Sequence, residues 1–188
     1  MGLRNTGTQY GAVAKTVHWL MAFMLLGSFS VGFYMADLPP SPARLQLFNY
    51  HKWAGVLALI VVTLRLLWRL AVPPPPLPAS MPNWQKQAAD ISHHVLYLLL
   101  FIAPLAGWLS SSAKGFQTVL FGKFPIPDLL SKNPPLGSAL NDVHVAAVWM
   151  LLGLIGLHVL AALKHHFVDR DDVLARMTPG VSAPSPKA

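Results

Sequence analysis

Eight histidines occur in a chain of 188 residues in which only 11% of residues are charged. Six of them lie inside or at the edge of apolar segments: His18, His51, His93, His94, His144 and His158. Ionisable side chains in such segments are energetically expensive and usually mark function. A histidine at the end of an apolar segment also fits simple placement at a membrane interface, so the spacing must decide between the two.

His144 and His158 are fourteen residues apart in one apolar segment. In an α-helix this separation is nearly four turns, so both side chains project from almost the same face, about 21 Å apart along the axis. His51 begins another apolar segment and, if successive segments alternate in direction, lies at the depth of His144. No other histidine of the apolar segments reaches that depth, so we expect His51 and His144 to form a pair.

At the other depth three histidines are potential partners of His158, namely His18, His93 and His94. Two imidazoles from facing helices can hold a haem inside a helix bundle. With both axial positions filled, the iron has no open site for oxygen, which favours electron transfer over oxygen activation. Zinc sites usually need three or four converging ligands, whereas these histidines come in twos. We therefore predict two haem b groups, one near each membrane face.

Four apolar stretches position these histidines: residues 16–36, 51–72, 91–113 and 143–163. Each is close to the roughly 20 residues that a helix needs to cross the hydrocarbon core, and in lipid such segments must be helical. The sequence predicts an all-α integral membrane protein, a bundle of four transmembrane helices. We expect one domain over residues 1–177 and a disordered tail over residues 178–188. The longest connection, residues 114–142, is expected to contain a short interfacial element near residues 116–124.

The composition excludes several classes of site. The chain has no cysteine, which excludes disulfides, iron–sulfur clusters and covalent haem attachment. The net charge is +7, but the basic residues lie between the apolar segments and form no single stripe, so we expect no nucleic-acid partner. Nine Lys and Arg lie on the side of both termini and five on the opposite side. This difference predicts that both termini face the cytoplasm.

Arg65 is fourteen residues after His51, so it lies on nearly the same helix face but at the inner level. A cation at this place can pair with the propionates of the inner haem, because buried charges need partners. Alternatively, Arg65 and Arg69 extend to the lipid headgroups, which suits Arg69 better.

Several short motifs together resemble the bacterial cytochrome b561 family. They are His18-Trp19-Leu20, His51 with Gly55, Arg65 with Arg69, His93 through Tyr97 to Pro104-Leu105-Ala106-Gly107, His144 with His158, and His165-His166. The resemblance covers residues 10–177. In that family the histidines of the first and fourth helices hold the inner haem, which implies His18 with His158 here. The same match implies His51 with His144 for the outer haem.

Members of the family move electrons across or within the bacterial cytoplasmic (inner) membrane, and one branch is a superoxide:ubiquinone oxidoreductase. The resemblance implies an enzyme that transfers electrons from superoxide, or another one-electron donor, at the periplasmic side to ubiquinone. Lys114 and Lys123 of the outer loop would raise the local concentration of a small anion, with ordinary solvation of the loop as the alternative. His93 and His165 are candidates for the quinone site, because imidazole titrates near neutrality.

Two other functions remain open. One is a haem b subunit that relays electrons for a larger membrane dehydrogenase or hydrogenase. The other is a haem-free transporter or metal carrier that uses its membrane histidines. Membrane lipid surrounds the chain in each case, and a homodimer through small residues of the helices also remains open.

Overall fold

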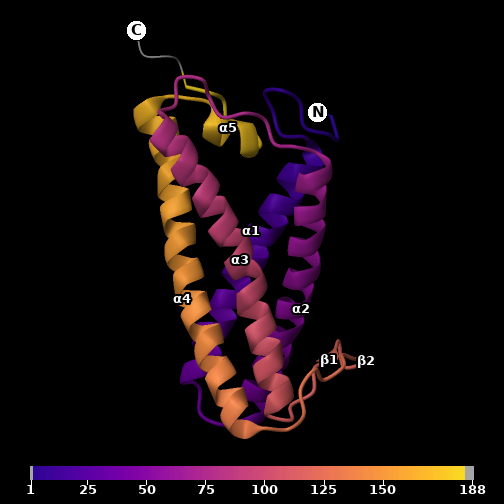
Figure 1. Ribbon diagram of the computed structural model, residues 1–188. Coiled ribbons are helices and arrows are strands. Elements are labelled where there is room, and N and C mark those ends of the chain that lie inside the picture. The colour runs from indigo at the N-terminus through magenta and orange to yellow at the C-terminus, as the bar shows by residue number, and fades with distance from the viewer. Residues whose placement is uncertain (1, 185–188) are drawn as a thin grey trace. The chain divides into compact units, whose positions relative to one another are not determined.

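Four long helices make up most of the computed structural model, which describes residues 2–184 (Figure 1). They are α1 (Ala12–Asp37), α2 (Pro42–Ala71), α3 (Asn83–Ala113) and α4 (Pro134–Lys164). The other elements are the strands β1 (Val119–Leu120) and β2 (Phe124–Pro125), the π-helical turn η1 (His165–Asp169) and α5 (Val173–Met177). Each of the four long helices is long and apolar enough to cross a membrane. Large apolar side chains such as Phe23, Leu64 and Leu157 are exposed on them, as expected for surfaces that lipid covers. The prediction of an all-α, four-helix integral membrane protein is confirmed.

Three of the helices begin well before the apolar segments from which they were predicted. Pro42 begins α2 and Pro134 begins α4, and proline suits the first turn because its missing N–H would have no helical partner there. The preceding residues act as caps. Ser41 Oγ accepts a hydrogen bond from Arg44 N at 3.2 Å, and Asn133 Oδ1 accepts the equivalent bond at 3.2 Å. Hydropathy alone does not report these starts, because the added turns are polar.

The chain forms two compact units whose boundaries fall inside the four long helices. Unit 1 contains residues 2–19, 64–98 and 151–184 of the described chain, and unit 2 contains residues 20–63 and 99–150. The single domain of residues 1–177 stays a prediction. So does the disordered tail, of which residues 185–188 lie outside the described residues.

In unit 1 the segments outside the long helices are joined by hydrogen bonds from side chains to backbone. Asn5 Nδ2 donates to Pro73 O at 3.0 Å, and Arg176 Nη1 donates to Pro76 O at 2.6 Å. The N-terminal segment, the Pro-rich connection after α2 and the α5 region therefore lie together at the same end of the helices (Figure 1).

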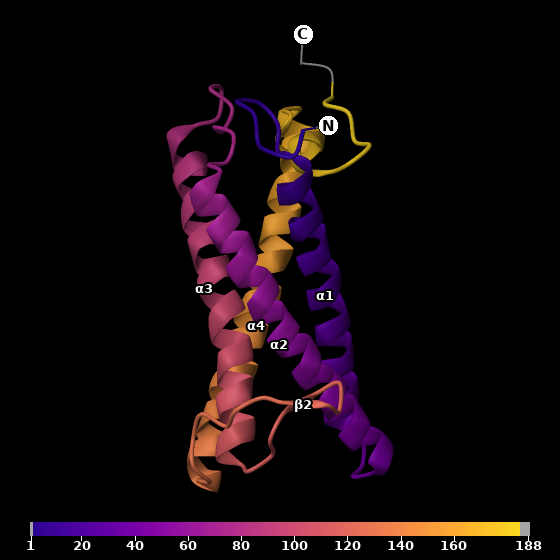
Figure 2. The ribbon, with the colours of Figure 1, turned by 90° about the vertical axis from the view of Figure 1, so that its right-hand side faces the viewer.

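In unit 2 the loop between α3 and α4 contains an antiparallel hairpin of β1 and β2, within the region where a short element was expected. The hairpin lies beside α2 (Figure 2). Lys52 Nζ donates to Phe116 O at 2.9 Å, and Trp53 Nε1 donates to Val119 O at 2.7 Å. Two consecutive side chains of α2 thus fix the loop in place.

Candidate functional site

His51 of α2 and His144 of α4 lie together in unit 2. Their ring centres are 6.1 Å apart, and the ring planes make an angle of 83°. Two imidazoles that bind one iron from opposite sides have ring centres about 6 Å apart, because each metal–nitrogen bond is about 2 Å long and each ring adds about 1 Å. The spacing of this pair therefore fits one haem iron between the two rings.

A backbone carbonyl orients each ring of this pair. His51 Nδ1 lies 3.1 Å from Ser28 O, and His144 Nδ1 lies 2.7 Å from Ala103 O. When Nδ1 donates its hydrogen to a carbonyl, Nε2 keeps the lone pair that binds a metal. Metal-binding histidines are commonly fixed by such a second hydrogen bond. Ring spacing and hydrogen bonding thus agree with a pair of axial ligands.

A glycine one helical turn after each of these carbonyls makes room for the ring. A Cβ added at Gly32 would lie 3.1 Å from His51 Cε1, and a Cβ added at Gly107 would lie 3.0 Å from His144 Nδ1. Both distances are shorter than favourable contacts, which are about 3.5–4.0 Å between carbon atoms. Each imidazole therefore packs directly against a glycine, and a larger residue at that position would displace the ring.

Three histidines lie close together in unit 1: His18 of α1, His93 of α3 and His158 of α4. The ring centre of His158 is 6.3 Å from that of His18 and 5.5 Å from that of His93. The first distance fits two ligands of one iron better than the second, which is shorter than the required separation of about 6 Å. His94 is exposed, and its Nδ1 lies 2.8 Å from Asp90 O in its own helix. Of the three potential partners, His18 has the most suitable geometry.

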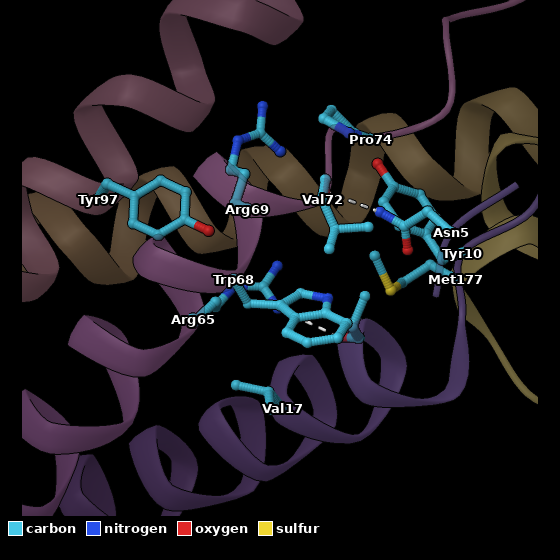
Figure 3. Close-up of a pocket in the computed structure, with 11 residues that line it drawn as sticks. Asn5, Tyr10, Val17, Arg65, Trp68, Arg69, Val72, Pro74, Tyr97 and Met177 are labelled. Atoms are coloured by element: carbon cyan, nitrogen blue, oxygen red, sulfur yellow. Dashed lines mark hydrogen bonds between the residues drawn. The ribbon is translucent and has the colours of Figure 1, made fainter. Parts of the chain in front are cut away.

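Arg65 of α2 lies beside these histidines. Its Nη1 donates a hydrogen bond to Ala14 O at 3.4 Å, and Ala14 lies one helical turn before His18 on α1. Within residues 2–184 no carboxylate lies within 4.0 Å of this guanidinium. Arg65 lines a small pocket together with Arg69, as Figure 3 shows. An anion bound there would meet a cation that has no acidic partner in the described chain.

The basic residues of unit 2 also form no ion pair within the described residues. They are Arg44, Lys52, Lys114, Lys123 and Lys132, against the acidic residues Asp37, Asp128 and Asp142. Lys123 is exposed between the two hairpin strands, and Lys114 is half-buried directly after α3. Since acidic groups do not neutralise these cations by direct contact, unit 2 presents a net positive charge to solvent.

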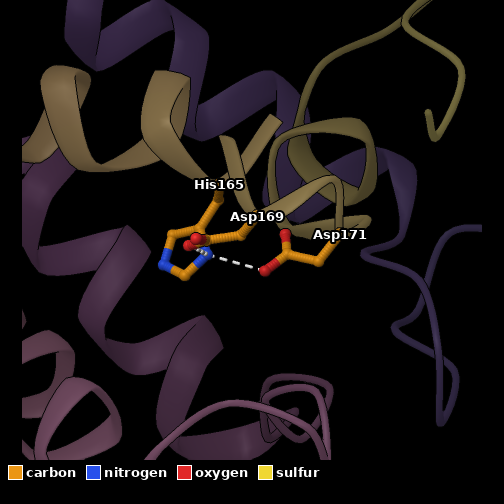
Figure 4. A group of neighbouring side chains, drawn as sticks. All are labelled: His165, Asp169 and Asp171. Atoms are coloured by element: carbon orange, nitrogen blue, oxygen red, sulfur yellow. Dashed lines mark hydrogen bonds and ion pairs between the residues drawn. The ribbon is translucent and has the colours of Figure 1, made fainter. Parts of the chain in front are cut away.

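His165 belongs to a polar cluster at the end of α4 in unit 1 (Figure 4). Its Nδ1 lies 2.6 Å from Asp171 Oδ2 and 3.2 Å from Asp169 Oδ2. Lys164 Nζ lies 2.6 Å from the same Asp169 oxygen. The spacing of these groups also suits a metal ion, but the histidine and lysine already partner both carboxylates. Both predicted quinone-site histidines, His93 and His165, belong to unit 1.

Comparison with known proteins identifies the family. The family model described as prokaryotic cytochrome b561 matches residues 9–180. The chain belongs to the prokaryotic cytochrome b561 family. Cytochrome b561 homolog 2 of Escherichia coli (strain K12) is 36% identical to it over 179 residues, which is 94% of this chain and 95% of that protein. A protein of Yersinia pestis named probable superoxide oxidase CybB is 28% identical over 171 residues, 91% of this chain and 96% of its own. Cytochrome b561 homolog 1 of E. coli (strain K12) is 25% identical over 166 residues, 87% of this chain and 93% of its own.

Proteins of the cytochrome b561 family bind b-type haem and transfer electrons in membranes. The donor sets of this member suit that group. They are the His51–His144 pair, whose rings are oriented through Nδ1 by carbonyl oxygens, and the group of His18, His93 and His158.

Sequence reasoning missed the residues that orient His51 and His144 in this cytochrome b561, namely Ser28, Gly32, Ala103 and Gly107. The sequence did contain a signal for them, because a small residue is followed four positions later by glycine at Ser28 and Gly32 in α1 and at Ala103 and Gly107 in α3. That spacing allows close approach to a transmembrane helix. It does not show that the approaching group is a histidine ring.

Proposed function

We propose that this cytochrome b561 holds two haem b groups, one between His51 and His144 and one between His18 and His158. The observation that carries the proposal is the spacing of the two ring pairs, 6.1 Å and 6.3 Å. Haem b, when bound, supplies one-electron redox chemistry. Because the chain provides two imidazoles at each place, a haem held there would have both protein ligands it needs and no place for oxygen to bind, which favours electron transfer.

We propose superoxide as the electron donor and ubiquinone as the acceptor. Two superoxide ions each lose one electron and become dioxygen. One ubiquinone takes up the two electrons and two protons and becomes ubiquinol. The relative named probable superoxide oxidase supports this assignment, and the unpaired basic residues of unit 2 support an anionic donor. Lys114 and Lys123 attract superoxide to the unit that contains the His51–His144 pair.

The remaining site residues act on the acceptor side of the reaction. His93 and His165 bind the quinone head group or deliver its protons, because an imidazole can both donate and accept hydrogen bonds. His93 lies against His158, with ring centres 5.5 Å apart, so a quinone bound at His93 would be next to the second haem ligand pair. Arg65 would balance the charge of a carboxylate of the haem held by that pair.

The excess of Lys and Arg on the side of both termini supports an orientation with these termini in the cytoplasm of a bacterium. This orientation places the loop that carries Lys114 and Lys123 on the periplasmic side of the cytoplasmic membrane. Superoxide bears a charge and crosses lipid poorly, so superoxide formed on that side stays there, and a positive loop facing it raises its local concentration.

The experiment is a superoxide:ubiquinone assay with purified protein in lipid vesicles that contain ubiquinone. We expect one ubiquinol for every two superoxide ions consumed, at a rate that falls as salt screens the basic loop. Lys123→Glu should lower the rate and weaken its salt dependence, whereas the control Lys86→Glu in unit 1 should not change the rate. Ubiquinol formation no faster than in vesicles without protein would refute the reaction.

A further inference from the structure

Unit 1 contains a small, partly open pocket lined by α1, α2 and α3 and by residues of the N-terminal and α5 segments (Figure 3). Its volume is about 30 Å³, which is room for about two water-sized groups. A quinone ring does not fit into such a space, but a carboxylate or one face of a phosphate does. The size of the pocket therefore limits its occupant to a small polar group or the end of a larger molecule.

The indole of Trp68 gives this pocket a hydrogen-bond donor without an acceptor. Trp68 Nε1 is buried and has no hydrogen-bond partner within the described chain, and Trp68 lines the pocket. An indole N–H only donates, and a buried donor usually finds an acceptor. Asn5, which also lines the pocket, directs its amide to Val72 O and Pro73 O and accepts from Gly11 N. A group bound in the pocket can supply the acceptor that Trp68 lacks.

Two cations flank this donor on α2. Arg65 precedes Trp68 by three residues and Arg69 follows it directly, and both line the pocket. Neither has a carboxylate within 4.0 Å in residues 2–184. Figure 3 shows Tyr97 of α3 with its hydroxyl turned toward the two arginines. The N–H of Trp68 and the two positive charges, neither of which has an acidic partner, therefore suit an anion that has oxygen atoms.

We propose that this pocket binds an anionic oxygen group, to which Trp68 Nε1 donates a hydrogen bond while Arg65 and Arg69 balance its charge. Such a group is either a carboxylate of the haem or the phosphate of a lipid headgroup. The hydrogen bond from Arg65 to Ala14 O, one helical turn before His18 on α1, favours the haem carboxylate, and this assignment rests on the proposed haem between His18 and His158. Arg69 thereby gains a role in the pocket beyond contact with headgroups.

Trp68→Phe tests the proposal because it removes the N–H and keeps an aromatic ring. Trp84→Phe is the matched control, since Trp84 is also in unit 1 but is 67% exposed. Two properties are measured on the purified full chain. One is the propionate bending band in the resonance Raman spectrum of the reduced haems, and the other is the amount of phospholipid bound per chain.

A shift of the propionate band in Trp68→Phe, and none in Trp84→Phe, assigns the pocket to a haem carboxylate. An unchanged band with loss of about one phospholipid per chain assigns it to a lipid phosphate. If neither property changes, the pocket binds no anion and the proposal is wrong. Arg69→Gln must reproduce the change, which keeps the test valid if Trp68→Phe folds poorly. Absence of any haem absorption band would instead refute the proposed haem ligands, while the phospholipid measurement would still test the pocket.

Discussion

Substitution of Gly107 by alanine should selectively weaken the haem that we assign to His51 and His144. The added Cβ would lie 3.0 Å from Nδ1 and 3.2 Å from Cε1 of His144. To restore a contact of about 3.5 Å, the ring must move by about half an ångström. That movement lengthens the hydrogen bond from His144 Nδ1 to Ala103 O, now 2.7 Å, because Ala103 lies on the same helix face one turn earlier.

The size of the effect follows from the role of this bond. Loss of the hydrogen bond that orients a metal-binding histidine typically lowers metal affinity about 10- to 100-fold. This corresponds to about 1.4–2.8 kcal/mol of binding free energy. The backbone itself should tolerate the change, since alanine in place of glycine favours a helix by about 0.5–1 kcal/mol. We therefore expect a folded protein with one weakened haem site.

The assay is a titration of haem into the haem-free protein, followed by the absorption of each reduced haem. Gly27→Ala in α1 is the matched control, because nothing lies within 4 Å of its added Cβ and the gain in helix propensity is the same. Gly107→Ala should bind one haem normally and the other about 10- to 100-fold more weakly. Equal affinity of both haems in Gly107→Ala and Gly27→Ala would refute the view that the fit of Gly107 against His144 supports a ligand.

Two predictions concern the loop of unit 2. Ser112→Ala should destabilise the protein by about 1–3 kcal/mol. The reason is that Ser112 Oγ forms hydrogen bonds with both N and O of Leu130 at 3.0 Å and the residue is only 2% exposed. A melting temperature equal to that of the parent would contradict this prediction. Trp53→Phe removes the bond to Val119 O at 2.7 Å and should speed hydrogen exchange in residues 114–133, while exchange in α4 stays the same. Unchanged exchange in that loop would show that Trp53 does not fix it.

The four membrane helices were predictable because their apolar segments dominate the local sequence. The starts of α2 and α4 were not, since Ser41 and Asn133 set them through capping bonds that hydropathy does not report. Capping residues before a proline are nevertheless a readable signal. A search for them would have placed both helix starts closer to Pro42 and Pro134.

Depth along a helix can be read from sequence, whereas lateral position cannot. Depth alone brought His51 and His144 together, because no third histidine shared their level. Depth could not choose among His18, His93 and His94 as the partner of His158. All three lie at its depth and differ only in the direction from which they approach it. The ring distances of 6.3 Å and 5.5 Å depend on how the helices pack sideways. The carbonyls that orient the rings, Ser28 O and Ala103 O, could not be predicted from sequence for the same reason, because every residue has a backbone carbonyl and only the packing selects these two.

The central claim is that each of two histidine pairs holds one haem. The most direct measurement is the haem content per chain of the purified protein, of His144→Ala, of His158→Ala and of the double variant, each with helix content checked by circular dichroism. We predict two haems in the parent, one in each single variant with a different haem lost in each, and none in the double variant. One haem in the parent, or a single variant that keeps both haems, would contradict the account.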